Sequence, residues 1–213
     1  MRALPVAALL CLAACAGGPP APEWKADAHG ALESFEAAYL RGDSRNAEQE
    51  FARGRAALAS TGRADLVARA ELVRCAARVA SLDFDDCPGF RALAADAAPA
   101  ERAYAAYLAG RAQSADIGLL PEHHRVVASS GTLPVIADPL SRLVAAGVLF
   151  RQARIDPAGI ALAVDTASAQ GWRRPLLAWL GVQARRAEEA GDLDAAASIR
   201  RRIGLVTSEA GDR

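Results

Sequence analysis

Two cysteines in the central part of the chain, Cys75 and Cys87, are the side chains best suited to covalent chemistry. Their spacing is too wide for the CxxC motif of redox enzymes. Cys75 falls in a segment of helical periodicity, and Cys87 follows an expected turn at 82–86, so a chain that folds back there brings the two thiols together. The residues leave two alternatives, a disulfide between Cys75 and Cys87 or two buried free thiols.

The two neighbouring histidines do not have the spacing of a metal site. His123 and His124 are adjacent in the sequence, and adjacent side chains on a helix point about 100° apart. No HExxH motif and no Cys/His cluster accompanies them. We therefore expect solvated or half-buried histidines here, and no metal.

The close spacing of three aspartates, Asp83, Asp85 and Asp86, is superficially similar to that of a calcium-binding loop. Such a loop requires glycine at its sixth position and glutamate at its twelfth. Pro88 and Ala94 occupy these two positions. Helix capping and solvation explain the aspartates, and we expect no bound calcium.

Motifs for nucleophilic or nucleotide chemistry are missing from the sequence. Ser129-Ser130-Gly131 lacks the flanking glycine of a GxSxG nucleophile elbow. Lys25 is the one lysine of the chain, which excludes an SxxK motif from the body, and neither a P-loop nor GxGxxG occurs. The sequence therefore predicts no catalytic residue and no cofactor.

The charges of the 213-residue chain balance, with 25 basic and 25 acidic side chains. This balance excludes the basic footprint of a nucleic-acid-binding protein. Arg200, Arg201 and Arg202 form a basic run, and Glu188 and Glu189 precede it. Salt-linked surface positions explain this run most simply. The functional alternative is a basic ridge that binds an acidic partner or an anionic lipid.

Residues 1–14 have the organisation of a signal peptide. Arg2 supplies a positive charge, and residues 3–14 are uncharged and largely apolar. As a helix, this run would span roughly 18 Å, well short of the ~30 Å hydrocarbon core of a bilayer. We therefore expect a cleaved signal segment and not a stable membrane span.

The run ends in Leu12-Ala13-Ala14-Cys15, which resembles the lipobox of bacterial lipoproteins. The resemblance implies cleavage before Cys15, lipidation of its thiol and acylation of the new amino terminus. Two or three acyl chains anchor a protein firmly, whereas one does so only marginally. Residues 15–22 would then form the anchor and a Gly/Pro tether. The alternative is an ordinary secretory signal peptide, in which Cys15 follows the small residues by chance and is not lipidated.

The same resemblance bears on location and on the thiols. Ala16, and not aspartate, follows Cys15, which in the enterobacterial sorting pattern favours the outer membrane, with the body facing the periplasm. The envelope outside the inner membrane is oxidising, which favours the disulfide between Cys75 and Cys87. A bridge of this loop length contributes about 3 kcal/mol through the unfolded state.

Residues 23–207 have the composition and periodicity of an all-helical domain. We expect residues 208–213 to form a disordered tail. Alanine, the best helix former, supplies about a quarter of the chain, and aromatic residues supply 5%. The range 64–82 carries two apolar stripes, as expected for a helix packed on two sides. Asp138-Pro139 and Asp156-Pro157 have the pattern of helix starts, with aspartate as N-cap and proline next. No segment alternates as a strand does.

About ten helices are expected, paired into roughly five antiparallel hairpins of the length found in helical repeats. Two stretches resemble the tetratricopeptide turn, in which Gly-Asp is followed by small and apolar residues at fixed spacing. They are Tyr39-Leu40-Arg41-Gly42-Asp43 with Ala47, Phe51 and Gly54, and 187–192 with Ala196 and Ile203. Arg200 stands where the second copy should have an aromatic residue, and the middle units match only in period. An irregular helical bundle is the alternative.

The combined features predict a lipid-anchored envelope protein that acts as an interaction or assembly scaffold. Its partners would be the membrane, through the anchor, and an envelope protein that the sequence does not name. One alternative is an envelope enzyme, for example one acting on peptidoglycan, which requires a pocket that raises the pKa of a carboxyl group such as Glu101 or Glu122. Another is a carrier of an apolar ligand, which requires an elongated cavity lined by Ala, Leu and Val.

Overall fold

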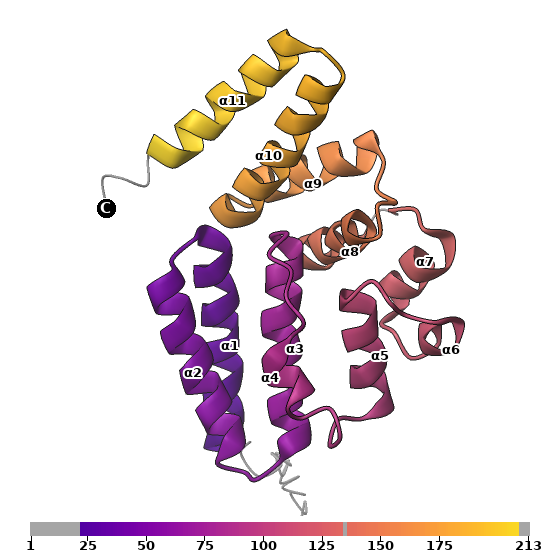
Figure 1. Ribbon diagram of the computed structural model, residues 1–213. Helices are drawn as coiled ribbons and strands as arrows, with labels where there is room; N and C mark the ends of the chain where they lie inside the picture. The colour runs from indigo at the N-terminus through magenta and orange to yellow at the C-terminus, as the bar shows by residue number, and fades with distance from the viewer. Residues whose placement is uncertain (1–21, 134–135, 209–213) are drawn as a thin grey trace, which may run out of the picture.

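The computed structural model describes residues 22–133 and 136–208, and every regular element in these ranges is a helix (Figure 1). The predicted all-α fold is confirmed. The predicted signal peptide, Cys15 and nearly all of the tether precede the described residues, and the predicted tail, apart from Ser208, follows them. The helices are α1 (Glu23–Arg41), α2 (Ser44–Ala59), α3 (Ala64–Ala80), α4 (Pro88–Arg91), α5 (Pro99–Leu108), α6 (Ser114–Ile117), α7 (Glu122–Ser130), α8 (Pro139–Arg151), α9 (Pro157–Ala169), α10 (Arg173–Glu189) and α11 (Leu193–Ser208).

Helices α1 and α2 form an antiparallel hairpin around the turn at Gly42 and Asp43. Gly42 ends α1 with a φ of 90°, a left-handed conformation that favours glycine. The Asp43 carboxylate then accepts a hydrogen bond from the backbone N–H of Asn46 and caps α2. The rings of Phe35 and Phe51 pack 5.2 Å apart between the two helices. The turn residues Gly42 and Asp43 therefore determine where the chain reverses direction, and packing of the two phenylalanine rings holds α1 against α2.

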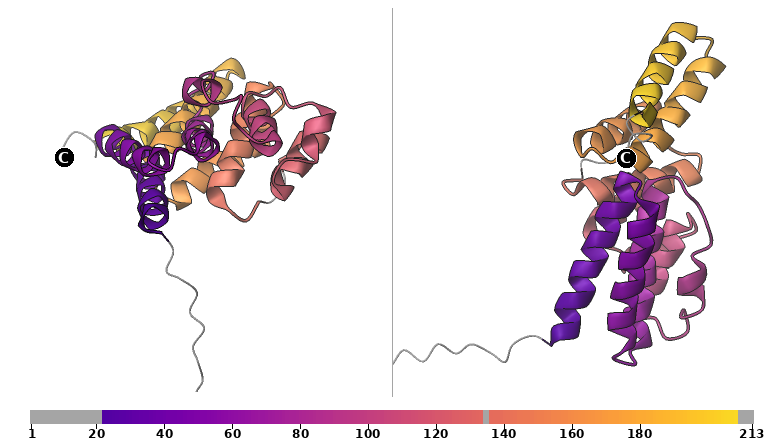
Figure 2. Two further views of the ribbon diagram at one scale, coloured as in Figure 1. Left: turned by 90° about the horizontal axis from the view of Figure 1, so that it is seen from below. Right: turned by 90° about the vertical axis from the view of Figure 1, so that its left-hand side faces the viewer.

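Helices α10 and α11 repeat this turn near the C-terminus. Gly191 has a φ of 75°, and the Asp192 carboxylate accepts from the backbone N–H of Ala195. Figure 2 shows an elongated molecule, with the α10–α11 hairpin at one end and the start of α1 at the other. Ala196 is the buried residue of α11, so this last helix is held mainly by α10.

The centre of the molecule is the crossing of α3 and α8. Gly147 of α8 faces the backbone of α3 so closely that a methyl group there would overlap the carbonyl oxygen of Val79. Most of the main hydrophobic core surrounds this crossing, with Leu143, Ala146 and Leu149 fully buried. A residue without a side chain therefore allows two helices distant in the sequence to touch.

Between α3 and α8 the chain departs from regular hairpin pairing. Helices α4 and α6 have four residues each, and α3 packs against α5 and α8 as well as its neighbour α2. The predicted helix starts are confirmed: Asp138 accepts from the N–H of Ser141 at 2.6 Å, and Asp156 accepts from that of Gly159 at 2.7 Å.

Among the helices described, none combines the length and the apolar character that crossing a membrane requires.

Candidate binding cleft

A cleft of about 1000 Å³ opens between α1, α3, α5, α7 and α8. Its size matches sites that hold small ligands or a few side chains of a partner. Eight of its lining residues are exposed to solvent, so the cleft is open at its rim; they are Glu33, Arg69, Ala100, Leu119, Pro121, Arg125, Asp138 and Gln170.

The floor of the cleft is apolar. Helix α1 contributes Leu40, α3 contributes Leu72, and α8 contributes Val144, each at most 3% exposed. Leu120, which precedes α7, is fully buried beside them, whereas its neighbour Leu119 is 45% exposed at the rim. The cleft therefore offers apolar contact from within and one exposed apolar side chain at its edge.

One wall of the cleft carries carboxylates that lack a cationic partner. Glu36 is half-buried on α1, and burial, the charge of Asp138 and the charge of Glu33 raise the pKa of Glu36 to about 7. Within the described ranges, no ion pair involves Glu36 or Asp138. Because Asp138 also caps α8, its side chain is held in place at the cleft by the helix that it starts.

Tyr104 of α5 lies in the cleft close to the same carboxylates. Burial raises the pKa of the Tyr104 hydroxyl, and the charges of Glu36 and Asp138 raise it further. Three elements that are distant in the sequence therefore place two carboxyl groups and a phenol in one cleft.

An aromatic cluster lies next to Tyr104. The His124 ring is 5.7 Å from that of Tyr104 and 4.8 Å from that of Tyr107. Burial lowers the pKa of His124 to about 3, so the imidazole is neutral at physiological pH. The Nδ1 atom of His124 and the hydroxyl of Tyr107 are buried without a hydrogen-bond partner among the described residues.

The arginines that line the cleft have partners other than Glu36 and Asp138. Arg69 pairs with Glu101 at 2.6 Å, and Nε of Arg125 donates to the carbonyl oxygen of Leu120, also at 2.6 Å. Four carboxylates and two arginines line the cleft; they are Glu33, Glu36, Glu101, Asp138, Arg69 and Arg125. The cleft therefore carries an excess of negative charge when Glu36 is ionised.

Of the two carboxyl groups that the sequence offered for an enzyme, Glu101 lines the cleft and Glu122 is exposed outside it. The group with the raised pKa is instead Glu36, which the sequence analysis missed. Its signal was available: Glu36 stands four residues after Leu32 and four before Leu40, inside an apolar stripe. Asp138 was recognised only as a helix cap.

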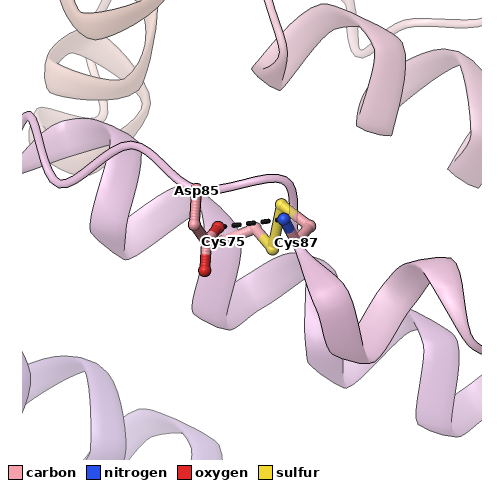
Figure 3. A group of neighbouring side chains, drawn as sticks. All are labelled: Cys75, Asp85 and Cys87. Atoms are coloured by element: carbon pink, nitrogen blue, oxygen red, sulfur yellow. Dashed lines mark hydrogen bonds between the residues drawn. A yellow bond between two sulfur atoms is a disulfide. The ribbon is translucent and has the colours of Figure 1, made fainter.

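Cys75 and Cys87 are joined by a disulfide, with their Cα atoms 5.8 Å apart (Figure 3). The Asp85 carboxylate accepts a hydrogen bond from the backbone N–H of Cys87 at 2.9 Å. Ligand atoms of these three residues lie within 4.8 Å of one another, but the two sulfurs are bonded to each other. The bridge closes the loop after α3, outside the cleft.

The three aspartates near the disulfide face arginines. Asp83 and Asp85 each pair with Arg78 at 3.0 Å, and Asp86 lies 3.8 Å from Arg91 and 3.9 Å from Arg151. Asp83 and Asp86 are exposed to solvent, as expected, and these ion pairs add to their solvation.

The remaining candidates also lie apart from the cleft lining. Arg200, Arg201 and Arg202 are exposed on α11, and Arg200 pairs with Glu188 at 2.6 Å. The expectation of a solvated or half-buried histidine holds for His123 but is wrong for His124, which is 1% exposed. Packing between α5 and α7 buries it, a contact that local sequence does not reveal.

No protein-family model, no curated protein and no solved structure matches this chain.

Proposed function

We propose that this chain is a lipid-anchored protein of the bacterial cell envelope whose helical body binds a segment of a partner protein in the cleft. The observation that carries the proposal is the open cleft of about 1000 Å³ with an apolar floor and a charged wall. Apolar side chains of a docked segment gain free energy when they cover such a floor. The protein then acts as an interaction or assembly scaffold.

The location is the first half of the proposal, and it rests on the lipobox resemblance at residues 12–15. Acyl chains on Cys15 would tether the body to the membrane, in the outer membrane with the body in the periplasm. The Cys15→Ser variant tests this directly. We expect the wild-type chain to take up labelled palmitate and to fractionate with membranes, and the variant to lose the label. A variant that keeps the label would contradict the anchor.

The cleft is the second half, and photo-crosslinking in cells tests it. A photoreactive residue at position 119 sits on the rim of the cleft, whereas one at 126 sits on α7 with similar exposure but outside the cleft lining. Leu119 and Val126 are 45% and 47% exposed, which makes them a matched pair.

We expect a discrete protein adduct from position 119 and none from position 126. The adduct should disappear when Ala37→Arg fills the cleft and places a cation beside its carboxylates. Equal adducts from both positions, or adducts that survive Ala37→Arg, would place the partner on another surface. The alternative that the sequence offered is the exposed run Arg200–Arg202 on α11, and neutralising it should leave the adduct from position 119 unchanged.

A second function is favoured by one observation, the raised pKa of Glu36 beside Asp138. A carboxylic acid that holds its proton near neutral pH can act as a general acid, and a second carboxylate can assist, as in the hydrolysis of glycosidic bonds. Incubation of purified protein with peptidoglycan tests this function. Soluble fragments from the wild type but not from Glu36→Gln would support an enzyme, and no release at excess protein would exclude it.

A further inference from the structure

We propose that Glu36, Tyr104 and Asp138 form a cation subsite in the cleft, which takes the guanidinium or ammonium group of a basic side chain on the docked segment. The inference rests on the proposed function, because it says which residue the partner segment presents to the cleft. It identifies the occupant as an apolar segment that carries a basic residue.

The geometry that supports the subsite comes from three helices. Glu36 lies on α1, Tyr104 on α5 and Asp138 at the start of α8. All three side chains line the one cleft. The charges of Glu36 and Asp138 raise the pKa of the Tyr104 hydroxyl, and the charge of Asp138 raises that of the Glu36 carboxyl group. A basic group bound in this cleft therefore lies among side chains from all three helices.

The subsite lacks a cation of its own. In the part of the chain that the structure describes, neither Glu36 nor Asp138 takes part in an ion pair, and the carboxyl group of Glu36 is half-buried. A half-buried carboxylate without a partner has lost part of its hydration, and a cation supplied from outside compensates for that loss. Arg69 cannot supply it without leaving Glu101.

The three groups also suit the chemistry of a basic side chain. Carboxylates accept charge-assisted hydrogen bonds from guanidinium or ammonium groups, and these bonds are stronger than neutral ones. Tyr104 lines the cleft, and a cation placed over an aromatic ring gains further attraction. A guanidinium group, which is planar and has five donors, fits two carboxylates and a ring better than a compact ammonium group does.

The rest of the cleft restricts what flanks the basic residue. Leu40, Leu72 and Val144 form the floor, so the flanking side chains should be apolar. Glu33 at the rim disfavours an acidic residue there. A short segment with one arginine between leucines satisfies both conditions.

Binding of the cation should depend on pH through Glu36. The pKa of Glu36 is about 7, so the subsite carries its full negative charge only above neutral pH. Below pH 7, binding of a cation releases the proton of the Glu36 carboxyl group. The charged and titratable groups that line the cleft around Glu36 are Glu33 on α1, Arg69 on α3, Glu101 and Tyr104 on α5, Arg125 on α7 and Asp138 on α8.

Short fluorescent peptides test the subsite on the full-length protein in phosphatidylcholine nanodiscs. The probe is acetyl-Leu-Leu-Arg-Leu-Leu-amide with a fluorescent label, and the control peptide has citrulline, the neutral isostere of arginine, at the central position. Anisotropy at pH 8 should show the arginine peptide binding about tenfold more tightly, since a charged hydrogen-bonded contact contributes at least that much. Empty nanodiscs give the baseline.

Three variants separate the subsite from the rest of the cleft. In Glu36→Gln and in Asp138→Asn, the preference for arginine over citrulline should fall to about threefold or less. Asparagine still caps a helix, so Asp138→Asn keeps the start of α8. Glu122→Gln removes an exposed carboxylate outside the cleft and should keep the full preference. Circular dichroism confirms that each variant is folded.

The pH profile supplies a second readout. Between pH 6 and pH 8, affinity for the arginine peptide should rise about tenfold in the wild type, as Glu36 ionises, and should stay flat in Glu36→Gln. The citrulline peptide should show no such rise. A rise of equal size in Glu36→Gln would overturn the assignment of Glu36.

The outcomes distinguish the two proposals. If both peptides bind equally in the wild type, the cation subsite is wrong and the apolar cleft stands. If neither binds and position 119 yields no adduct, the cleft is not a docking site and both proposals fail. If spermidine binds more tightly than the arginine peptide, the occupant is a free amine and not a partner's side chain.

Discussion

The indole N–H of Trp179 on α10 donates a hydrogen bond to the carbonyl oxygen of Ala80, the last residue of α3, over 3.1 Å. Trp179 is fully buried, and its ring packs edge-on against that of Phe150 at 5.8 Å. Carbonyl groups in the last turn of a helix have no partner within that helix. One side chain therefore satisfies the end of α3 and fastens the C-terminal part of the molecule to a wall of the cleft.

Replacing Trp179 with phenylalanine removes this bond and leaves a cavity. The carbonyl oxygen of Ala80 stays buried without a donor, so we expect the free energy of unfolding to fall by about 2 kcal/mol. Urea denaturation followed by circular dichroism measures the change. A loss below about 0.5 kcal/mol would mean that water replaces the indole at no cost.

Alanine at Gly147 should push α3 and α8 apart. The added methyl group meets the backbone of Val79, which cannot rotate away as a side chain can. We expect a loss of about 2 kcal/mol from this overpacking. Gly181 is the matched control, because it also lies inside a helix but has no atom within 4 Å of the added methyl group. Gly181→Ala should be neutral or stabilising by about 0.5 kcal/mol, and equal effects at the two positions would contradict the close crossing.

Removing the disulfide should destabilise the fold through the unfolded state. The double variant Cys75→Ala with Cys87→Ala frees a loop with a sequence separation of 12, and we expect a loss of about 3 kcal/mol. Dithiothreitol should lower the stability of the wild type by a similar amount and leave the double variant unchanged. A wild type that does not respond to reductant would show that the thiols are free in solution.

Glu36→Gln should stabilise the protein at high pH and not at low pH. The folded-state pKa of Glu36 is about 7 and its ordinary value is 4.5, so unfolding releases a proton between these limits. Stability is therefore lost as pH rises through this window, and the penalty is complete above about pH 7. Allowing for partial solvent screening, we expect the variant to gain about 2 kcal/mol at pH 8 and nothing at pH 4.5. Urea denaturation of both proteins at the two pH values gives the difference.

His124 should act in the opposite direction. Its folded-state pKa is about 3 and its ordinary value is 6.5, so the unfolded chain takes up a proton that the folded protein refuses. Stability is fully present above pH 6.5 and is lost as pH falls toward 3, by about 2 kcal/mol at pH 5. His124→Phe keeps an aromatic ring beside Tyr107 and should remove this part of the acid sensitivity. His29→Gln, a change at an exposed histidine beside Glu33, should leave the sensitivity as it is.

The helices and two of the turns could be predicted from the sequence because their signals are local. Gly42 and Asp43 end one helix and cap the next within a few residues, and Asp138 and Pro139 start α8 in the same way. These preferences depend on backbone conformation and on hydrogen bonds to nearby groups. The spacing of the cysteines likewise placed two thiols near one turn, where the structure joins them.

The burial of His124 and the approach of α3 to α8 could not be predicted in this way. A histidine on a short helix looks the same in the sequence whether its ring meets water or two tyrosines. Gly147 carries no signal of its partner, since Val79 lies far away along the chain. Both depend on which helices pack together.

The sequence by itself determined an alanine-rich all-α body and the ends of many of its helices, because helix formation and capping are decided within one or two turns of chain. Only the tertiary structure decided that Glu36, Tyr104 and Asp138 share one cleft. Packing of α1, α5 and α8 on α3 places these residues around one cleft, and burial in it raises the pKa of the Glu36 carboxyl group. Proximity and desolvation are properties of the folded arrangement, so a local pattern could mark Glu36 as a carboxyl group in an apolar stripe but could not reveal that it shares a cleft with Tyr104 and Asp138.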